Sequence, residues 1–223
     1  PHGGGGPGAG IVAVTDRLEP YLPIPIVGRR DGSSGAEFGW LAEGERPRSI
    51  GRLSGFMGNG GILLRAYVYM RLLGAEGMRR VSGFATLNAN YLMKRLAAAG
   101  FAPAFPQRRA SHEFIISLKD VARDTGVTAM DFAKALLDRG FHAPTTYFPM
   151  LVPECLLIEP TETEARQELD AFAQALIDIR DLAFRDAAEV KRAPLTTPVR
   201  RLDDVRAARQ LDLTWQSRAN SVR

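Results

Sequence analysis

Residues 84–179 alternate between the spacing typical of helices and the spacing typical of strands. An apolar stripe at helical spacing runs up to Gly100, through Phe84, Leu87, Tyr91, Leu92 and Leu96. HEFIISL at 112–118 alternates like a strand, and CLLIE at 155–159 has the composition of a short buried strand. With two further helices in the same region, this order predicts an α/β or α+β layer in which helices pack against a small sheet.

Those two helices each begin with a capping signal. Thr128 with Asp131, and Thr161 with Glu164, have the spacing of a capping box. The first helix closes at Gly140 and carries Phe132, Leu136 and Leu137; the second carries Ala165, Leu169, Phe172, Leu176 and Ile179. Capping accounts for the acidic run EPTETE at 159–164, because carboxylates suit the positive end of a helix dipole. A catalytic role for Glu159 or Glu162 stays open beside it.

The N-terminal part is richer in glycine and proline. IVAV at 11–14 predicts a short buried strand, and the prolines of EPYLPIP exclude a helix or a central strand there. Residues 28–48 are polar and glycine-rich, which predicts an exposed excursion or hairpin. ILLRAYVYMRLL at 62–73 is apolar on nearly every face, so it predicts a buried helix after the glycine loop GFMGNGG.

Composition narrows the classes of function. The net charge is +4, and its arginine excess near the C-terminus is interrupted by Asp203 and Asp204 without interleaved aromatic residues, which argues against nucleic-acid binding. Arg65 and Arg71 interrupt the most apolar stretch, so no membrane span is expected. Cys155 is the only cysteine and lies in an apolar run, which predicts an inert buried thiol and fits the cytoplasm.

The chain opens with PHGGGGPGAG, in which six of ten residues are glycine. Such a run could be a linker, a phosphate cradle or an active-site loop, and it lacks the Lys-Ser/Thr ending of a P-loop. His2, His112 and His142 do not have metal-ligand spacing, so no metal site is expected. His142 lies in the loop RGFHAPTTYFP, where binding residues concentrate, although structural histidines are more common than catalytic ones.

Seven segments in order resemble the C-terminal part of the glycine cleavage system P-protein, the pyridoxal-phosphate-dependent glycine decarboxylase. They are PHGGGGPGAG, EPYLP, LNANYLMKRL, SHEFI, RGFHAPTTYFP, IEPTETE and TPVRRLDDVRAAR. The last segment resembles subunit 2 of the bacterial two-subunit form. The resemblance implies an α/β fold, the C-terminal part of a type I pyridoxal-phosphate transferase. Residues 1–60 would end the large cofactor-binding domain, 61–190 would form a connecting helix and the small α/β domain, and 191–223 a tail.

The resemblance also implies the activity. Glycine is decarboxylated on pyridoxal phosphate, and the aminomethyl group passes to the lipoyl arm of the H-protein. The implied partners are the H-protein and subunit 1 or the missing N-terminal part, in an oligomer. In this family the cofactor lysine precedes the Pro-His-Gly run, upstream of Pro1, so we expect the fragment alone to be inactive. A piece that begins inside the large domain would also expose the apolar 11–14 and 62–73 segments.

By the same resemblance, the site residues come from several segments. His2 and His142 are the catalytic candidates. The cofactor-binding candidates are Gly3, Gly4, Gly5, Gly6, Gly58, Asn59 and His112, and Thr145 with Thr146 would lie on the substrate or partner side. Two other functions stay open: a non-catalytic scaffold subunit of the same fold, and another fold-type I decarboxylase or aminotransferase.

Overall fold

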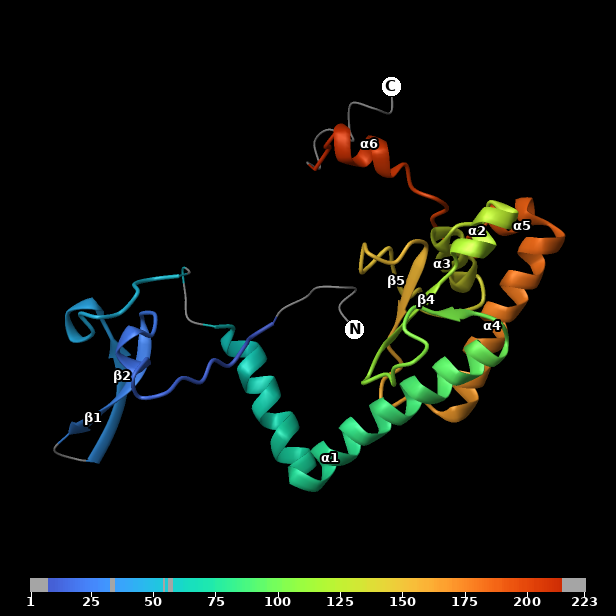
Figure 1. The fold of residues 1–223 in the computed structure, drawn as a ribbon. Coiled ribbons are helices and arrows are strands. Elements are labelled where there is room, and N and C mark those ends of the chain that lie inside the picture. The colour runs from blue at the N-terminus through green and yellow to red at the C-terminus, as the bar shows by residue number, and fades with distance from the viewer. Residues whose placement is uncertain (1–7, 33–34, 54, 56–57, 214–223) are drawn as a thin grey trace. The chain divides into compact units, whose positions relative to one another are not determined.

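A computed structural model describes residues 8–32, 35–53, 55 and 58–213. The chain divides into two compact units, Pro1–Met78 and Arg79–Arg223 (Figure 1). The long helix α1 (Gly60–Ala98) belongs partly to each, and its helical geometry is broken at Gly74, which has φ 63° and ψ −177°. Glycine adopts this left-handed φ without a steric penalty, so it suits a break inside a helix.

The described part of the first unit contains a hairpin before α1. Its antiparallel strands are β1 (Ile26–Gly32) and β2 (Gly35–Leu41), and one-turn 3-10 helices flank it at Glu19–Tyr21 and Glu43–Glu45. Phe38 and Trp40 of β2 are exposed. The hairpin therefore confirms the exposed excursion predicted for residues 28–48.

The strand predicted at residues 11–14 is wrong. These residues form no regular element, and Ile11 and Val12 are 87% and 77% exposed. A strand requires a neighbour that pairs its N–H and C=O groups. In the described part of the first unit, β1 and β2 pair with each other and leave this segment without such a neighbour.

The helix predicted at residues 62–73 is confirmed, but its predicted burial is not. Asn59 begins α1, where its Oδ1 accepts a hydrogen bond from the Ile62 N–H at 3.4 Å. Leu64 and Leu72 are 64% and 81% exposed, and the successive residues Tyr67, Val68, Tyr69 and Met70, which together span the circumference of the helix, are exposed as well. This chain therefore exposes the apolar surface expected of a piece of a larger domain.

The second unit is built on a four-stranded antiparallel sheet of order β3-β4-β6-β5. The strands are β3 (Ala102–Pro103), β4 (Phe114–Ser117), β5 (Thr145–Thr146) and β6 (Cys155–Ile158). The helices are the second part of α1, α2 (Lys119–Thr125), α3 (Ala129–Leu137), α4 (Arg166–Arg185), α5 (Ala187–Lys191) and α6 (Asp204–Arg209). The strands predicted from 112–118 and 155–159 are confirmed as β4 and β6.

One face of this sheet packs on the helices. Ile116 lies beside Leu156, and Phe114 beside Ile158, and all four side chains are buried. They join a core with Leu92, Leu96, Phe132, Leu136, Leu176 and Ile179 from α1, α3 and α4. In Figure 1, α2, α3 and α5 gather at one end of α4. The result is a two-layer α/β unit, as the order of helix and strand patterns predicts.

The predicted capping box at the start of α3 is confirmed. The Thr128 N–H donates to Asp131 Oδ2 at 2.8 Å, and the Asp131 N–H donates to Thr128 Oγ1 at 3.3 Å. Asp131 also forms an ion pair with Arg201 at 2.7 Å. Asp138, at the other end of α3, accepts hydrogen bonds from the backbone N–H groups of Leu195 and Thr196. The segment after α5 is thus fastened to both ends of α3.

The capping box predicted from Thr161 and Glu164 is wrong. Helix α4 begins only at Arg166, and Ala165 caps it without a side-chain hydrogen bond. Residues 161–164 form a turn in which the Glu164 N–H donates to the Thr161 carbonyl at 3.3 Å. The Asn88 side chain on α1 holds this turn through its backbone carbonyls. A tertiary contact has therefore replaced the local cap.

The Asp131–Arg201 ion pair should make the free energy of unfolding depend on pH. Burial opposes ionisation of Asp131, but hydrogen bonds from Thr128 and the Arg201 guanidinium outweigh it and lower its pKa. A carboxyl whose pKa is lower in the folded state adds stability above its unfolded pKa of about 3.9, and this stability is lost as pH falls below that value. Asp131→Asn should therefore lower the free energy of unfolding at pH 7 by about 1–3 kcal/mol.

Urea denaturation at pH 7 and at pH 3 to 4 measures this effect. The difference between wild type and Asp131→Asn should shrink on acidification. Asp120→Asn is the matched control, because it breaks an ion pair with Arg123 in which both side chains are mostly exposed. Equal losses in the two variants, or a difference that stays constant with pH, would contradict the assignment.

Candidate functional site

Three candidate segments meet at one end of the four-stranded sheet. Phe114 at the start of β4 pairs with Ile158 at the end of β6, and Thr145 at the start of β5 pairs with Leu157. The strands are antiparallel, so the residues before β4, before β5 and after β6 lie at the same end. His112, His142 and Glu159 occupy these three positions.

A hollow of about 380 Å³ opens at this end of the sheet. One wall is a face of α1, a second is the loop before β4, and a third is the turn after β6. The lining residues are Val81, Ser82, Ala85 and Thr86 from α1, Ser111 and His112 from the loop, and Glu159, Pro160, Thr161 and Glu162 from the turn. We call it the sheet-end cavity. It brings His112 together with the two glutamates whose catalytic role the sequence left open.

The sheet-end cavity carries groups that can move protons and bind amines. Ser111 Oγ lies 3.3 Å from His112 Nδ1, so the hydroxyl orients the imidazole through that nitrogen. A histidine near two carboxylates and several hydroxyls is a common arrangement for general acid–base chemistry. The carboxylates of the cavity also attract a positively charged amine and repel a ligand that carries a carboxylate.

His142, Thr145 and Thr146 reach the same end of the sheet without lining the cavity. Thr145 and Thr146 form β5 and pair with Leu157 and Leu156. His142 lies in the exposed loop that precedes them. These three residues are therefore neighbours of the cavity along the sheet edge.

Gly58 and Asn59 lie in the first unit, at the N-terminus of α1. Gly58 has φ 70°, which favours glycine, and a Cβ added at Gly60 would meet nothing within 4 Å. An open, glycine-rich helix N-terminus presents backbone N–H groups and the positive end of the helix dipole, which together suit a phosphate. His2 and Gly3–Gly6 lie outside the residues that the structure describes.

The lysines and the cysteine lie away from the sheet-end cavity. Lys94, Lys119, Lys134 and Lys191 are on α1, α2, α3 and α5, and none lines the cavity. Cys155 is fully buried in β6, and burial raises the pKa of its thiol, as expected for an inert cysteine.

Neither a metal-ligand cluster nor a membrane-spanning helix occurs among the described residues. No group of three or more His, Cys, Asp or Glu side chains among them could hold a metal ion. None of the described helices has the length and apolar character needed to cross a membrane.

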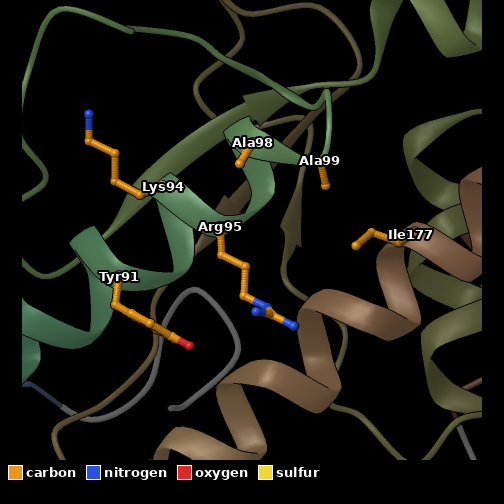
Figure 2. Close-up of a pocket in the computed structure, with 6 residues that line it drawn as sticks. All are labelled: Tyr91, Lys94, Arg95, Ala98, Ala99 and Ile177. Atoms are coloured by element: carbon orange, nitrogen blue, oxygen red, sulfur yellow. The ribbon is translucent and has the colours of Figure 1, made fainter.

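A second hollow, of about 530 Å³, lies between α1 and α4. Figure 2 shows Arg95 pointing toward α4 and Lys94 pointing away from it. The Tyr91 hydroxyl donates to Asp170 at 2.5 Å, and Arg95 forms an ion pair with the same carboxylate at 3.2 Å. Tyr91 and Arg95 thus join the two helices through Asp170, which makes this hollow a packing feature.

Comparisons with known proteins identify the family. A family described as "Glycine dehydrogenase, C-terminal domain" matches residues 81–198, more than half of the chain. The chain belongs to the glycine dehydrogenase family. The resemblance to the P-protein predicted from its motifs is thereby confirmed.

Individual relatives agree with this family. The chain is 60% identical over its whole length to the probable glycine dehydrogenase (decarboxylating) subunit 2 of Nitrosospira multiformis, of which it covers 44%. It is 61% identical over 98% of its length to the corresponding protein of Methylococcus capsulatus, again covering 44% of it. The chain therefore spans less than half of the length of the relatives it matches.

A solved structure supports the fold. The crystal structure of an inhibitor-bound glycine decarboxylase (P-protein) of the glycine cleavage system matches 73% of this chain with a TM-score of 0.58. The match covers 37% of that chain at 22% sequence identity. The predicted fold class, the C-terminal part of a type I pyridoxal-phosphate transferase, is thus confirmed for this member of the glycine dehydrogenase family.

The cavity includes polar residues that sequence reasoning did not nominate. Ser82 and Thr86 on α1 and Ser111 before β4 all line it. Ser82 and Thr86 are four residues apart, so they share one face of the helix. This spacing in the sequence shows that the two side chains share a face of the helix. That this face lines a cavity depends on the turn after β6, which packs beside it in the structure.

Proposed function

We propose that this chain forms the C-terminal part of a glycine decarboxylase that acts in glycine cleavage. The observation that carries the proposal is 60% identity to a glycine dehydrogenase (decarboxylating) subunit 2 across the whole chain. Because the chain spans 44% of that relative, the remaining length would supply the rest of the active site. Residues 1–60 would contribute to the large domain and residues 61–190 to the connecting helix and small domain.

The proposed cofactor is pyridoxal phosphate, and the described residues fit part of it. The open glycine-rich N-terminus of α1, at Gly58 and Asn59 in the first unit, suits the phosphate of a cofactor held across a subunit boundary. The covalent linkage needs an amine, and all four lysines of this chain lie on helices outside the sheet-end cavity. The lysine would therefore come from the part of the protein beyond this chain, next to a loop containing His2 and Gly3–Gly6.

When bound, pyridoxal phosphate supplies an electron sink for the electron pair left by departing carbon dioxide. The residues of this chain would position glycine and move protons. We assign His112 Nε2 to hold or deliver a proton, because Ser111 lies at Nδ1. Glu159 and Glu162 would attract the amine side of the substrate, while His142, Thr145 and Thr146 would form the adjoining edge.

The proposed partners follow from the same assignment. The relatives are named subunit 2, which implies a subunit 1 in the same complex. We propose that the aminomethyl group passes to the lipoyl arm of an H-protein, and that the oligomeric complex works in the bacterial cytoplasm.

The test uses the complete subunit that carries this sequence, together with subunit 1 and lipoylated H-protein. Carboxyl-labelled glycine should release labelled carbon dioxide only when all three proteins and pyridoxal phosphate are present. Labelled carbon dioxide from another amino acid but not from glycine would favour a different decarboxylase. A purified complex that binds its partners but releases none would favour the scaffold function.

The 223-residue chain by itself should form no covalent link to the cofactor. Incubation with pyridoxal phosphate and borohydride, followed by peptide mass analysis, should give no stoichiometric pyridoxyl adduct. The complete subunit, treated in parallel, should give one adduct outside this chain. A single stoichiometric adduct on one of the four lysines of this chain would contradict the proposal.

A further inference from the structure

Two asparagines on α1 fasten the two loops of the sheet-end cavity. Asn88 Nδ2 donates to the carbonyls of Thr161 and Glu164, at 2.8 and 3.1 Å. Asn90 Nδ2 donates to the Ala110 carbonyl at 2.8 Å, and Asn90 Oδ1 accepts from the Ala110 N–H at 3.0 Å. Each asparagine thus grips the backbone of a different loop.

The backbone groups that accept or donate these hydrogen bonds lie next to the candidate catalytic side chains. Ala110 directly precedes Ser111 and His112, and Thr161 lies between Glu159 and Glu162 in the cavity wall. The third wall, including Ser82 and Thr86, is α1 itself. One helix therefore carries one wall and sets the positions of the other two.

Asn90 is held in place by its own helix as well. Its Nδ2 also donates to the Thr86 carbonyl, one turn earlier, at 2.8 Å. The amide then uses both its donor and its acceptor groups at fixed positions, which restricts its rotamer. A side chain fixed in this way transmits the position of α1 to the loop before β4.

Apolar packing anchors the neighbours of these loop residues and not the polar side chains themselves. Pro160 is buried and Ala110 packs against the core, whereas Ser111, His112 and Glu159 are exposed. Hydrogen bonds to the loop backbone have directional geometry and leave the polar side chains facing the cavity. Asparagine is a weaker helix former than alanine by roughly half a kcal/mol, so these positions on α1 are not explained by helix propensity.

We infer that Asn88 and Asn90 are positioning residues that hold the glutamates after β6 and His112 at a fixed separation across the sheet-end cavity. This inference rests on the proposed function, since it treats the cavity as part of the glycine site. It assigns to the LNANYL segment of α1 a role in catalysis that acts through the backbone of two loops. Neither asparagine lines the cavity, so each would act only through the loop backbone.

The experiment compares variants of the complete subunit, assembled with subunit 1. Asn90→Ala removes the grip on Ala110, and Asn88→Asp keeps the shape of the side chain but cannot donate to two carbonyls. Asn88→Gln keeps the donor on a longer arm. Gln174→Ala is the control, because it removes an amide hydrogen bond to Asp178 on the exposed surface of α4.

Hydrogen–deuterium exchange measures, independently of activity, how strongly each asparagine restrains the backbone of its loop. Asn90→Ala should accelerate exchange in residues 110–113 alone, and Asn88→Asp in residues 161–165 alone. For both variants, kcat for carbon dioxide release should fall by about tenfold to a hundredfold, since small misplacements of catalytic groups have effects of this size. KM for glycine should change by less than about twofold in Asn90→Ala, which displaces the proton-transfer group, and should rise in Asn88→Asp, which displaces the glutamates that attract the amine.

The pH profile and the rescue variant separate positioning from stability. The pH dependence of kcat should shift in both variants, and Asn88→Gln should recover most of the loss. Local exchange changes with wild-type kcat and pH profile would overturn the inference, as would equal losses in Asn88→Asp and Asn88→Gln. If wild type itself releases no carbon dioxide from glycine, the proposed function has failed, while the exchange data still report whether the asparagines fix the loops.

Discussion

Phe132→Ala is expected to lower the free energy of unfolding of the second unit by about 3–5 kcal/mol. The Phe132 side chain has no exposed surface and lies in the core where α3 meets α1, α4 and the sheet. Truncation removes its apolar contacts and leaves a cavity that the surrounding helices fill only partly. A loss of this size is comparable to the whole stability of many domains, so much of the variant should be unfolded at 37 °C.

Urea denaturation of the complete subunit, followed at a signal from the second unit, measures this loss. Phe148→Ala is the matched control, because the same side chain is 59% exposed there and should be replaceable with little effect. Similar losses at the two positions would contradict the core described here. A loss of less than about 1 kcal/mol in Phe132→Ala would also contradict this core.

His112→Gln is expected to lower kcat/KM for glycine decarboxylation by about a hundredfold or more, because general acid–base groups contribute factors of this order. Glutamine keeps a polar side chain of similar reach but cannot exchange a proton near neutral pH. His142→Gln should have a smaller effect, because His142 lies on the neighbouring sheet edge outside the sheet-end cavity.

Initial rates over a range of glycine concentrations and pH values test this ranking. The loss in His112→Gln should fall mainly on kcat. A larger effect at His142 than at His112 would move the centre of the site to the loop before β5. Wild-type rates in both variants would exclude the imidazoles from the chemistry.

Local signals in the sequence predicted the elements whose structure depends on local contacts. Thr128 and Asp131 cap α3 because both partners of the box lie within one turn of the chain. The alternation at Phe114 and Ile116 predicted a half-buried strand, and the structure has it in β4. These features need no information from distant residues.

Predictions failed where the deciding partner was distant in the sequence or was not found among the described residues. The turn at 161–164 has the spacing of a cap, but Asn88, far away in sequence, determines its structure. Residues 11–14 have the composition of a buried strand, yet no neighbouring strand pairs with them among the described residues. Composition indicates only that a segment is apolar, whereas strand formation depends on a neighbouring strand that pairs with it.

The sheet-end cavity could be predicted only in part. The motif resemblance nominated His112, and the acidic run kept Glu159 and Glu162 open. Their proximity follows from the antiparallel register of β4 and β6, which the sequence does not specify. The contribution of Ser82 and Thr86 depends further on how α1 packs against both loops.

The most direct test of the central claim is hydrogen–deuterium exchange of the complete, cofactor-loaded enzyme with and without glycine. If the sheet-end cavity belongs to the glycine site, glycine should slow exchange in residues 110–113 and 159–164 together. Exchange in α2, which contributes nothing to the cavity, should not change. Slowing confined to other segments, with both cavity loops unaffected at saturating glycine, would contradict the account.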